Sequence, residues 1–108
     1  MTDFNDRERA EEAKFAHDAD TQFRIQARRN RLLGQWAAGL MGLSEVEAEA
    51  YAKAVVQADF EEAGDEDVIR KLLGDLTSAG VDIDEARIRN ALEAKEVEAR
   101  RQFIEAQG

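Results

Sequence analysis

Three glycines separate four stretches of helix-forming sequence in this chain. Gly42, Gly64 and Gly80 are each followed within two residues by a serine or an aspartate. Glycine is common just beyond the end of a helix, and serine and aspartate are preferred immediately before the start of one. The chain contains no proline, and strong helix formers such as alanine, glutamate and arginine dominate it. The sequence therefore predicts an all-α fold, a small four-helix bundle.

Apolar side chains recur every three or four residues within each stretch, which is the pattern of an amphipathic helix. The predicted helices cover residues 19–41, 45–62, 66–79 and 84–105. The residues expected in the core are Phe23, Ala27, Leu33, Trp36, Ala37, Leu40, Met41, Ala48, Tyr51, Ala52, Val55, Phe60, Val68, Ile69, Leu72, Leu73, Leu76, Ile88, Ala91, Leu92, Ala99 and Phe103. The short connections favour antiparallel packing of neighbouring helices.

The helix starts carry recognisable capping residues. Ser44 and Glu47 are three residues apart, the spacing of a capping box. Asp65 is expected to cap the third helix, and Asp82 or Asp84 the fourth. These assignments predict a bundle that extends over residues 19–108.

Residues 1–18 differ in character from the rest of the chain. Phe4 and Phe15 are the large apolar residues between positions 2 and 17, and charged side chains fill most of the remaining positions. Such a segment has too little apolar surface to offset the entropy lost on ordering. We therefore expect residues 1–18 to form a mobile, partly helical arm that folds on a partner.

The net charge of −9 opposes binding to nucleic acid or to an anionic membrane, because both require basic surface. The charge is uneven: residues 21–31 hold four arginines and no acid, whereas residues 44–67 hold nine acids and Lys53 alone. The basic stretch suits an anionic ligand or partner, and arginines on a solvated helix face are the alternative. No apolar run is long enough to cross a bilayer. We expect a cytoplasmic protein without direct membrane insertion.

Catalytic chemistry has few candidate residues. The chain has no cysteine, and its one histidine, His17, lies in the arm, so zinc sites and Ser-His or Cys-His nucleophiles are excluded. The acidic run that starts at Asp59 fails as a calcium loop, because Ala63 and Arg70 occupy ligand positions. An enzyme that uses carboxylates alone remains an alternative, but we predict no enzyme. Titration of His17 near neutral pH could make docking of the arm pH-sensitive, and an exposed histidine of no consequence is the alternative.

Three blocks of the sequence resemble one family together, although each alone would be weak. They are Asp6-Arg7-Glu8-Arg9-Ala10 with Glu12-Ala13-Lys14-Phe15-Ala16-His17-Asp18; residues 27–38, ARRNRLLGQWAA; and residues 58–68, ADFEEAGDEDV, with Arg70-Lys71. In these blocks the chain resembles the zeta subunit of alphaproteobacterial ATP synthases, a small inhibitor of ATP hydrolysis by that rotary enzyme.

The resemblance implies a four-helix bundle with a mobile N-terminal inhibitory region. In this family that region enters a catalytic interface between the alpha and beta subunits of the soluble head, beside the gamma stalk, and blocks hydrolytic rotation. The resemblance also implies a location peripheral to the inner membrane, through the ATP synthase. Carried onto this chain, the implied arm contacts are Phe4, Arg7, Arg9, Lys14 and Phe15.

The resemblance further implies that the bundle binds ADP or ATP in a regulatory role, with no cofactor required. The candidate nucleotide-binding residues are Arg24, Arg28, Arg31 and Trp36, with Tyr51 as an alternative stacking surface. Arginine suits phosphate because it forms two parallel hydrogen bonds. The competing hypothesis is a generic helical adaptor that binds another protein through the basic stretch and has no ATPase partner.

Overall fold

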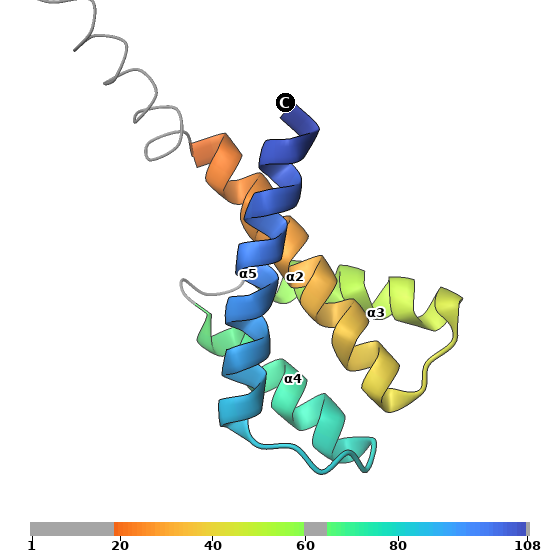
Figure 1. Ribbon diagram of the computed structural model, residues 1–108. Coiled ribbons are helices and arrows are strands. Elements are labelled where there is room, and N and C mark those ends of the chain that lie inside the picture. Colours follow the sequence, from red (N-terminus) through yellow and green to blue (C-terminus); the bar gives the residue numbers. More distant parts are fainter. Residues whose placement is uncertain (1–18, 60–64, 108) are drawn as a thin grey trace, which may run out of the picture.

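The computed structural model describes residues 19–59 and 65–107, and this part of the chain forms four helices without strands (Figure 1). They are α2 (Ala19–Met41), α3 (Glu45–Ala58), α4 (Glu66–Ser78) and α5 (Glu85–Gln107). The predicted all-α four-helix bundle is confirmed for the described residues. The predicted arm, residues 1–18, lies outside them, as does the expected end of the second helix at residue 62. The second helix is described only to Ala58.

The long helix α2 is the centre of the bundle and packs mainly against α3 and α5. Helix α4 lies beside the lower half of α5 in the view of Figure 1 and also contacts α2 and α3. Helices α2 and α5 run in opposite directions, so the start of α2 and the end of α5 lie at the same end of the molecule (Figure 1).

Two apolar clusters hold the helices together. The main cluster consists of the buried residues Leu33, Ala37, Val55, Val68, Ile69, Leu72, Leu76, Ile88 and Leu92. A smaller cluster, Ile25 with Ala99 and Phe103, joins the start of α2 to the end of α5. Burial of these side chains supplies the main driving force for folding.

Among the described residues, two that were expected in the core are exposed instead, and the expected core residue Phe60 lies outside the described residues. Phe23 is 51% exposed and Leu40 is 37% exposed. The buried stripe of α2 runs through Ile25, Arg29 and Leu33, at four-residue spacing. Because the charged Arg29 occupies the middle of this stripe, the apolar spacing alone favours Phe23 over Ile25 as the core residue at the start of the helix.

Helices α2 and α3 approach closely at Gly34. A Cβ atom on Gly34 would lie 2.8 Å from the Cα of Ala52 and 3.2 Å from Cγ2 of Val55. Glycine at this position therefore lets the two backbones come into direct contact, which the sequence alone did not predict.

The ends of α2 and α4 have the same geometry. Gly42 and Gly80 adopt left-handed φ angles of 73° and 85°. The amide of Leu43 donates to the carbonyl of Ala38 at 3.1 Å, as expected of a Schellman motif. Glycine is needed at both positions because other residues rarely adopt this conformation.

The starts of the helices match the predicted caps only in part. The capping box of α3 is confirmed: the amide of Glu47 donates to Ser44 Oγ at 3.2 Å, and the amide of Ser44 donates to Glu47 Oε1 at 2.9 Å. Asp84 caps α5 by accepting from the amide of Arg87 at 2.9 Å. Asp65 occupies the N-cap position of α4 as predicted, but its side chain makes no capping hydrogen bond and instead binds Arg29.

Candidate functional site

A groove of about 680 Å³ lies where the first half of α2, the helix α3 and the end of α5 meet. Its volume is within the range of small-molecule sites, roughly 300–1,000 Å³. The residues that line it are Phe23, Arg24, Ala27, Arg28, Arg31, Lys53, Val56, Phe103 and Ala106. We call this surface the basic groove.

The basic groove contains three of the four predicted nucleotide-binding residues. Arg24, Arg28 and Arg31 follow one another at four- and three-residue spacing, which places them on one face of α2. Trp36 is not among the lining residues and packs against the main core cluster. Tyr51 is also elsewhere, and its hydroxyl donates to Asp75 Oδ2 at 2.7 Å. Nucleotide binding by these residues stays a prediction.

The cations of the groove differ in their partners. Arg24 pairs with Asp20 at 3.0 Å, and Arg31 pairs with Glu49 at 2.6 Å. Arg28 and Lys53 form no ion pair with any residue in the described part of the chain. An incoming anion could therefore bind these two side chains without displacing a carboxylate.

Sequence reasoning did not assign Lys53 or the aromatic side chains to the groove. Lys53 lies on α3 and had a usable signal, since it is the only base among nine acids in residues 44–67. Phe103 was predicted as core and is 8% exposed, but it also lines the groove from α5. Phe23 and Phe103 are thus the aromatic side chains of the groove.

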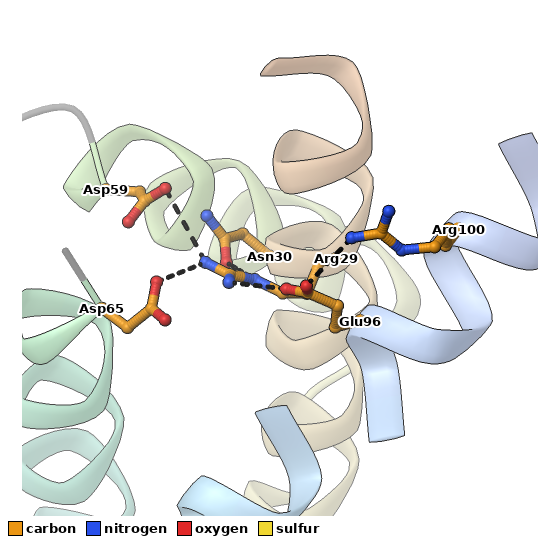
Figure 2. A network of polar contacts seen from close by, with 6 residues as sticks. All are labelled: Arg29, Asn30, Asp59, Asp65, Glu96 and Arg100. Carbon is orange, nitrogen blue, oxygen red and sulfur yellow. Dashed lines mark hydrogen bonds and ion pairs between the residues drawn. The ribbon is translucent and has the colours of Figure 1, made fainter. Parts of the chain in front are cut away.

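A second polar site lies in the interior and is centred on Arg29, as Figure 2 shows. The Arg29 side chain is only 3% exposed. Its Nε donates to Asn30 Oδ1 at 3.0 Å, and its Nη1 donates to Glu96 Oε1 on α5 at 3.1 Å. Nη2 donates to Asp65 Oδ1 at 2.9 Å and lies 3.8 Å from Asp59 Oδ2.

This set of residues, which we call the Arg29 cluster, links α2 to α5 and to both ends of the α3–α4 connection. Asp59 is the last residue before the undescribed segment 60–64, and Asp65 is the first residue after it, so one guanidinium binds both sides of the α3–α4 connection. Arg100 adds a second cation to the cluster, 3.3 Å from Glu96 Oε2. A buried charge requires such pairing, because burial without a partner is costly.

Sequence reasoning did not separate Arg29 from the neighbouring arginines. Its position was the available signal: Arg29 falls four residues after Ile25 and four before Leu33, on the buried stripe of α2. Among residues 19–59 and 65–107, no group of histidine, aspartate and glutamate side chains could hold a metal ion.

The predicted arm contacts lie outside the described residues. These are Phe4, Arg7, Arg9, Lys14 and Phe15, together with His17. None of the helices that the structure describes is both long enough and apolar enough to cross a membrane.

Comparison with known proteins supplies a family. The family model described as ATPase inhibitor subunit zeta matches residues 1–102. A protein structure determined by NMR in solution is similar, with 48% sequence identity and a TM-score of 0.71. That match covers 79% of this chain and 96% of the other. No curated protein matches the chain.

Proposed function

The chain belongs to the ATPase inhibitor subunit zeta family, and from this premise we propose that it blocks ATP hydrolysis by the rotary F-type ATP synthase with its N-terminal arm. The family is an inhibitor subunit rather than a catalytic enzyme, and it implies the ATP synthase as the partner. The observation that carries the proposal is the extent of the family match. It begins at residue 1 and ends at residue 102, so it includes both the arm and most of the bundle.

In the proposed mechanism, residues 1–18 insert between an alpha and a beta subunit of the soluble head, next to the gamma stalk. Phe4 and Phe15 anchor the arm, and Arg7, Arg9 and Lys14 pair with polar groups of the cleft. A segment that folds as it binds loses entropy on ordering, and this favours release when rotation reverses. The protein would then be cytoplasmic and held near the inner membrane by the ATP synthase alone.

The bundle supports this proposal by its construction at the base of the arm. A steric block needs a firm anchor, and α2 begins at Ala19, the residue after the proposed arm, and runs through the centre of the bundle. Ile25 packs against Ala99 and Phe103 two turns into this helix, and the buried Arg29 follows one turn later. Load on the arm would therefore be transmitted to all four helices.

We further propose that the basic groove binds the phosphates of ADP or ATP in a regulatory role. Of the four cations that line the groove, Arg28 and Lys53 form no ion pair with a described residue, and Arg24 and Arg31 flank them. Phe23, which lines the groove and is 51% exposed, would stack on the base in place of Trp36. The proposed inhibition itself requires no cofactor.

The test is ATP hydrolysis by the cognate soluble head, depleted of this subunit, with the full-length chain and with the chain lacking residues 1–18. Inhibition by the full-length chain alone would support both the partner and the arm. Equal inhibition by the two chains would overturn the role of the arm. If neither folded chain inhibits, the generic helical adaptor becomes the better hypothesis.

A further inference from the structure

The basic groove lies next to the point where the arm joins the bundle. Helix α2 begins at Ala19, immediately after the arm, and an α-helix rises about 1.5 Å per residue. By that rise, Arg28 lies roughly 14 Å along the helix axis from Ala19, and Arg31 roughly 18 Å. The end of α5, which carries the groove residues Phe103 and Ala106, lies at the same end of the molecule (Figure 1). A partner that binds residues 1–18 would therefore lie near this end of the molecule.

The charge of the groove is opposite to that of the whole chain. The chain carries a net charge of −9, whereas the groove collects three arginines and a lysine. Its two ion pairs are exposed, with the Arg24 and Arg31 side chains 66% and 51% accessible. Exposed pairs contribute little, so carboxylates of a partner can replace Asp20 and Glu49 at small cost. Ala27, Val56 and Phe103 add an apolar floor.

We propose that the basic groove is a second docking contact with the ATP synthase head, and that its occupant is an acidic segment of the head beside the entrance for the arm. This inference rests on the proposed function. Aspartate or glutamate side chains of that segment pair with Arg28 and Lys53, and an apolar side chain packs on Val56 and Phe103. The arm provides the block, while the groove orients the bundle.

The second contact would help the arm to bind through two physical effects. Charge complementarity raises the rate of encounter and selects the orientation in which the arm meets its cleft. Once the groove is seated, the arm is held close to the cleft, so its insertion becomes an intramolecular step with a high effective concentration. The acidic segment and the phosphates of a nucleotide would use the same cations, so the two occupants exclude one another.

A matched pair of charge reversals tests the groove. Arg28→Glu changes a groove residue, and Arg87→Glu makes the same change at the exposed start of α5, at the other end of that helix from Phe103. The measurement is the affinity of each folded, full-length variant for the immobilised head, without added nucleotide, over a range of salt concentrations. We expect Arg28→Glu to weaken binding roughly fivefold or more at low salt, and Arg87→Glu to change it by less than about twofold. The difference between them should shrink as salt is added.

The outcomes separate this inference from the proposed function. If the unmodified chain does not bind the head, the proposed function fails. If it binds and Arg28→Glu binds equally well, the groove contact alone is overturned.

A cross-linking experiment identifies the occupant. The chain contains no cysteine, so Ala106→Cys places a single reactive thiol at the groove for a photo-activated cross-linker. The expected product joins the thiol to a head segment rich in aspartate and glutamate. Thr2→Cys, in the arm, serves as the control for complex formation. Cross-linking from position 2 but not from position 106, or from position 106 only to a segment without acids, would overturn the inference.

Discussion

Arg29 and Asp65 are 36 residues apart in the sequence, yet their side chains share a hydrogen bond of 2.9 Å. The preceding residue, Arg28, lies about 100° away around the axis of α2 and lines the basic groove. Two successive arginines of one helix thus have different roles, because adjacent residues of a helix are about 100° apart around its axis. Arg29 joins the helices, whereas Arg28 is available to an anion.

Replacing Arg29 should destabilise the bundle. In Arg29→Met the carboxylates of Asp59, Asp65 and Glu96 lose the cation that they share. Removal of one partner from a fully buried pair costs about 3–5 kcal/mol, and Asp65 and Glu96 are partly solvated, so we expect a loss of about 2–4 kcal/mol. Urea denaturation measures this change as a lower free energy of unfolding.

Arg100→Met is the matched control for that experiment. Arg100 touches the same cluster through Glu96, but its side chain is 45% exposed. We expect its removal to cost less than about 1 kcal/mol. Equal losses from the two substitutions would contradict the structural role of Arg29.

Replacing glycine by alanine should have opposite effects on stability at two positions, Gly34 at the close contact of α2 with α3 and Gly74 at an open position on α4. In Gly34→Ala the new Cβ meets the backbone of Ala52 at 2.8 Å, so the two helices must move apart. We expect a loss of about 1–3 kcal/mol from this overpacking. In Gly74→Ala the new Cβ has nothing within 4 Å, and the gain in helix propensity should stabilise the bundle by up to about 1 kcal/mol. Thermal unfolding of both variants gives the sign, and stabilisation by Gly34→Ala would refute the packing argument.

Tyr51 should make the fold sensitive to alkali. Burial, reinforced by its hydrogen bond to Asp75, raises the pKa of the Tyr51 phenol above its ordinary value of 10.0. Below that value the phenol is protonated in both the folded and unfolded states, so its contribution to stability is fully present. As pH rises above 10.0, ionisation favours the unfolded chain, and the free energy of unfolding should fall.

The measurement is direct because Tyr51 is the only tyrosine. Phenolate absorbance, followed with circular dichroism, should appear only above the ordinary pKa and should accompany unfolding. Tyr51→Phe should flatten the decline of stability at high pH. Ionisation at the ordinary pKa with the helices still intact would count against burial of the hydroxyl.

The helices were predictable from the sequence because their signals are local. Glycine at the helix ends and the Ser44–Glu47 capping box act within a few residues of the positions that they fix. The apolar stripe of α4 also repeats without interruption, and most of the core residues predicted for α4 and α5 are buried. The stripe of α2 was misplaced because its central position holds Arg29, whose partners lie on other helices.

The groove could be predicted only in part, for the same reason. Arg24, Arg28 and Arg31 share a face of one helix, so their spacing alone brings them together. Lys53 and Phe103 reach the groove through packing of α3 and α5 against α2, which no local pattern encodes. Trp36 is close to these arginines in the sequence and lies on the same helix. Its position around the helix axis, however, directs its side chain to the main core cluster.

Nucleotide binding is tested by adding ADP to the isotope-labelled full-length chain and following its amide resonances. We expect shifts at Arg28 and Lys53, which lack an ion pair among the described residues, and little change at Trp36. Lys53→Glu should abolish them, because it places a carboxylate among the phosphate ligands. Shifts at Trp36 together with the groove arginines would favour stacking of the base on Trp36, and no shift in the groove would contradict the proposal.

The arm should fail without its aromatic anchors even when the bundle is intact. Phe4 and Phe15 are the large apolar side chains between positions 2 and 17, and burial of such a ring contributes about 1.5–3 kcal/mol. If both rings are buried in the cleft, Phe4→Ala combined with Phe15→Ala should raise the concentration for half-inhibition of ATP hydrolysis by at least about a hundredfold. The free energy of unfolding of the double variant should match that of the unmodified chain, which excludes damage to the bundle. Unchanged inhibition by the folded double variant would remove both side chains from the proposed contacts and leave the charged residues Arg7, Arg9 and Lys14 to hold the arm.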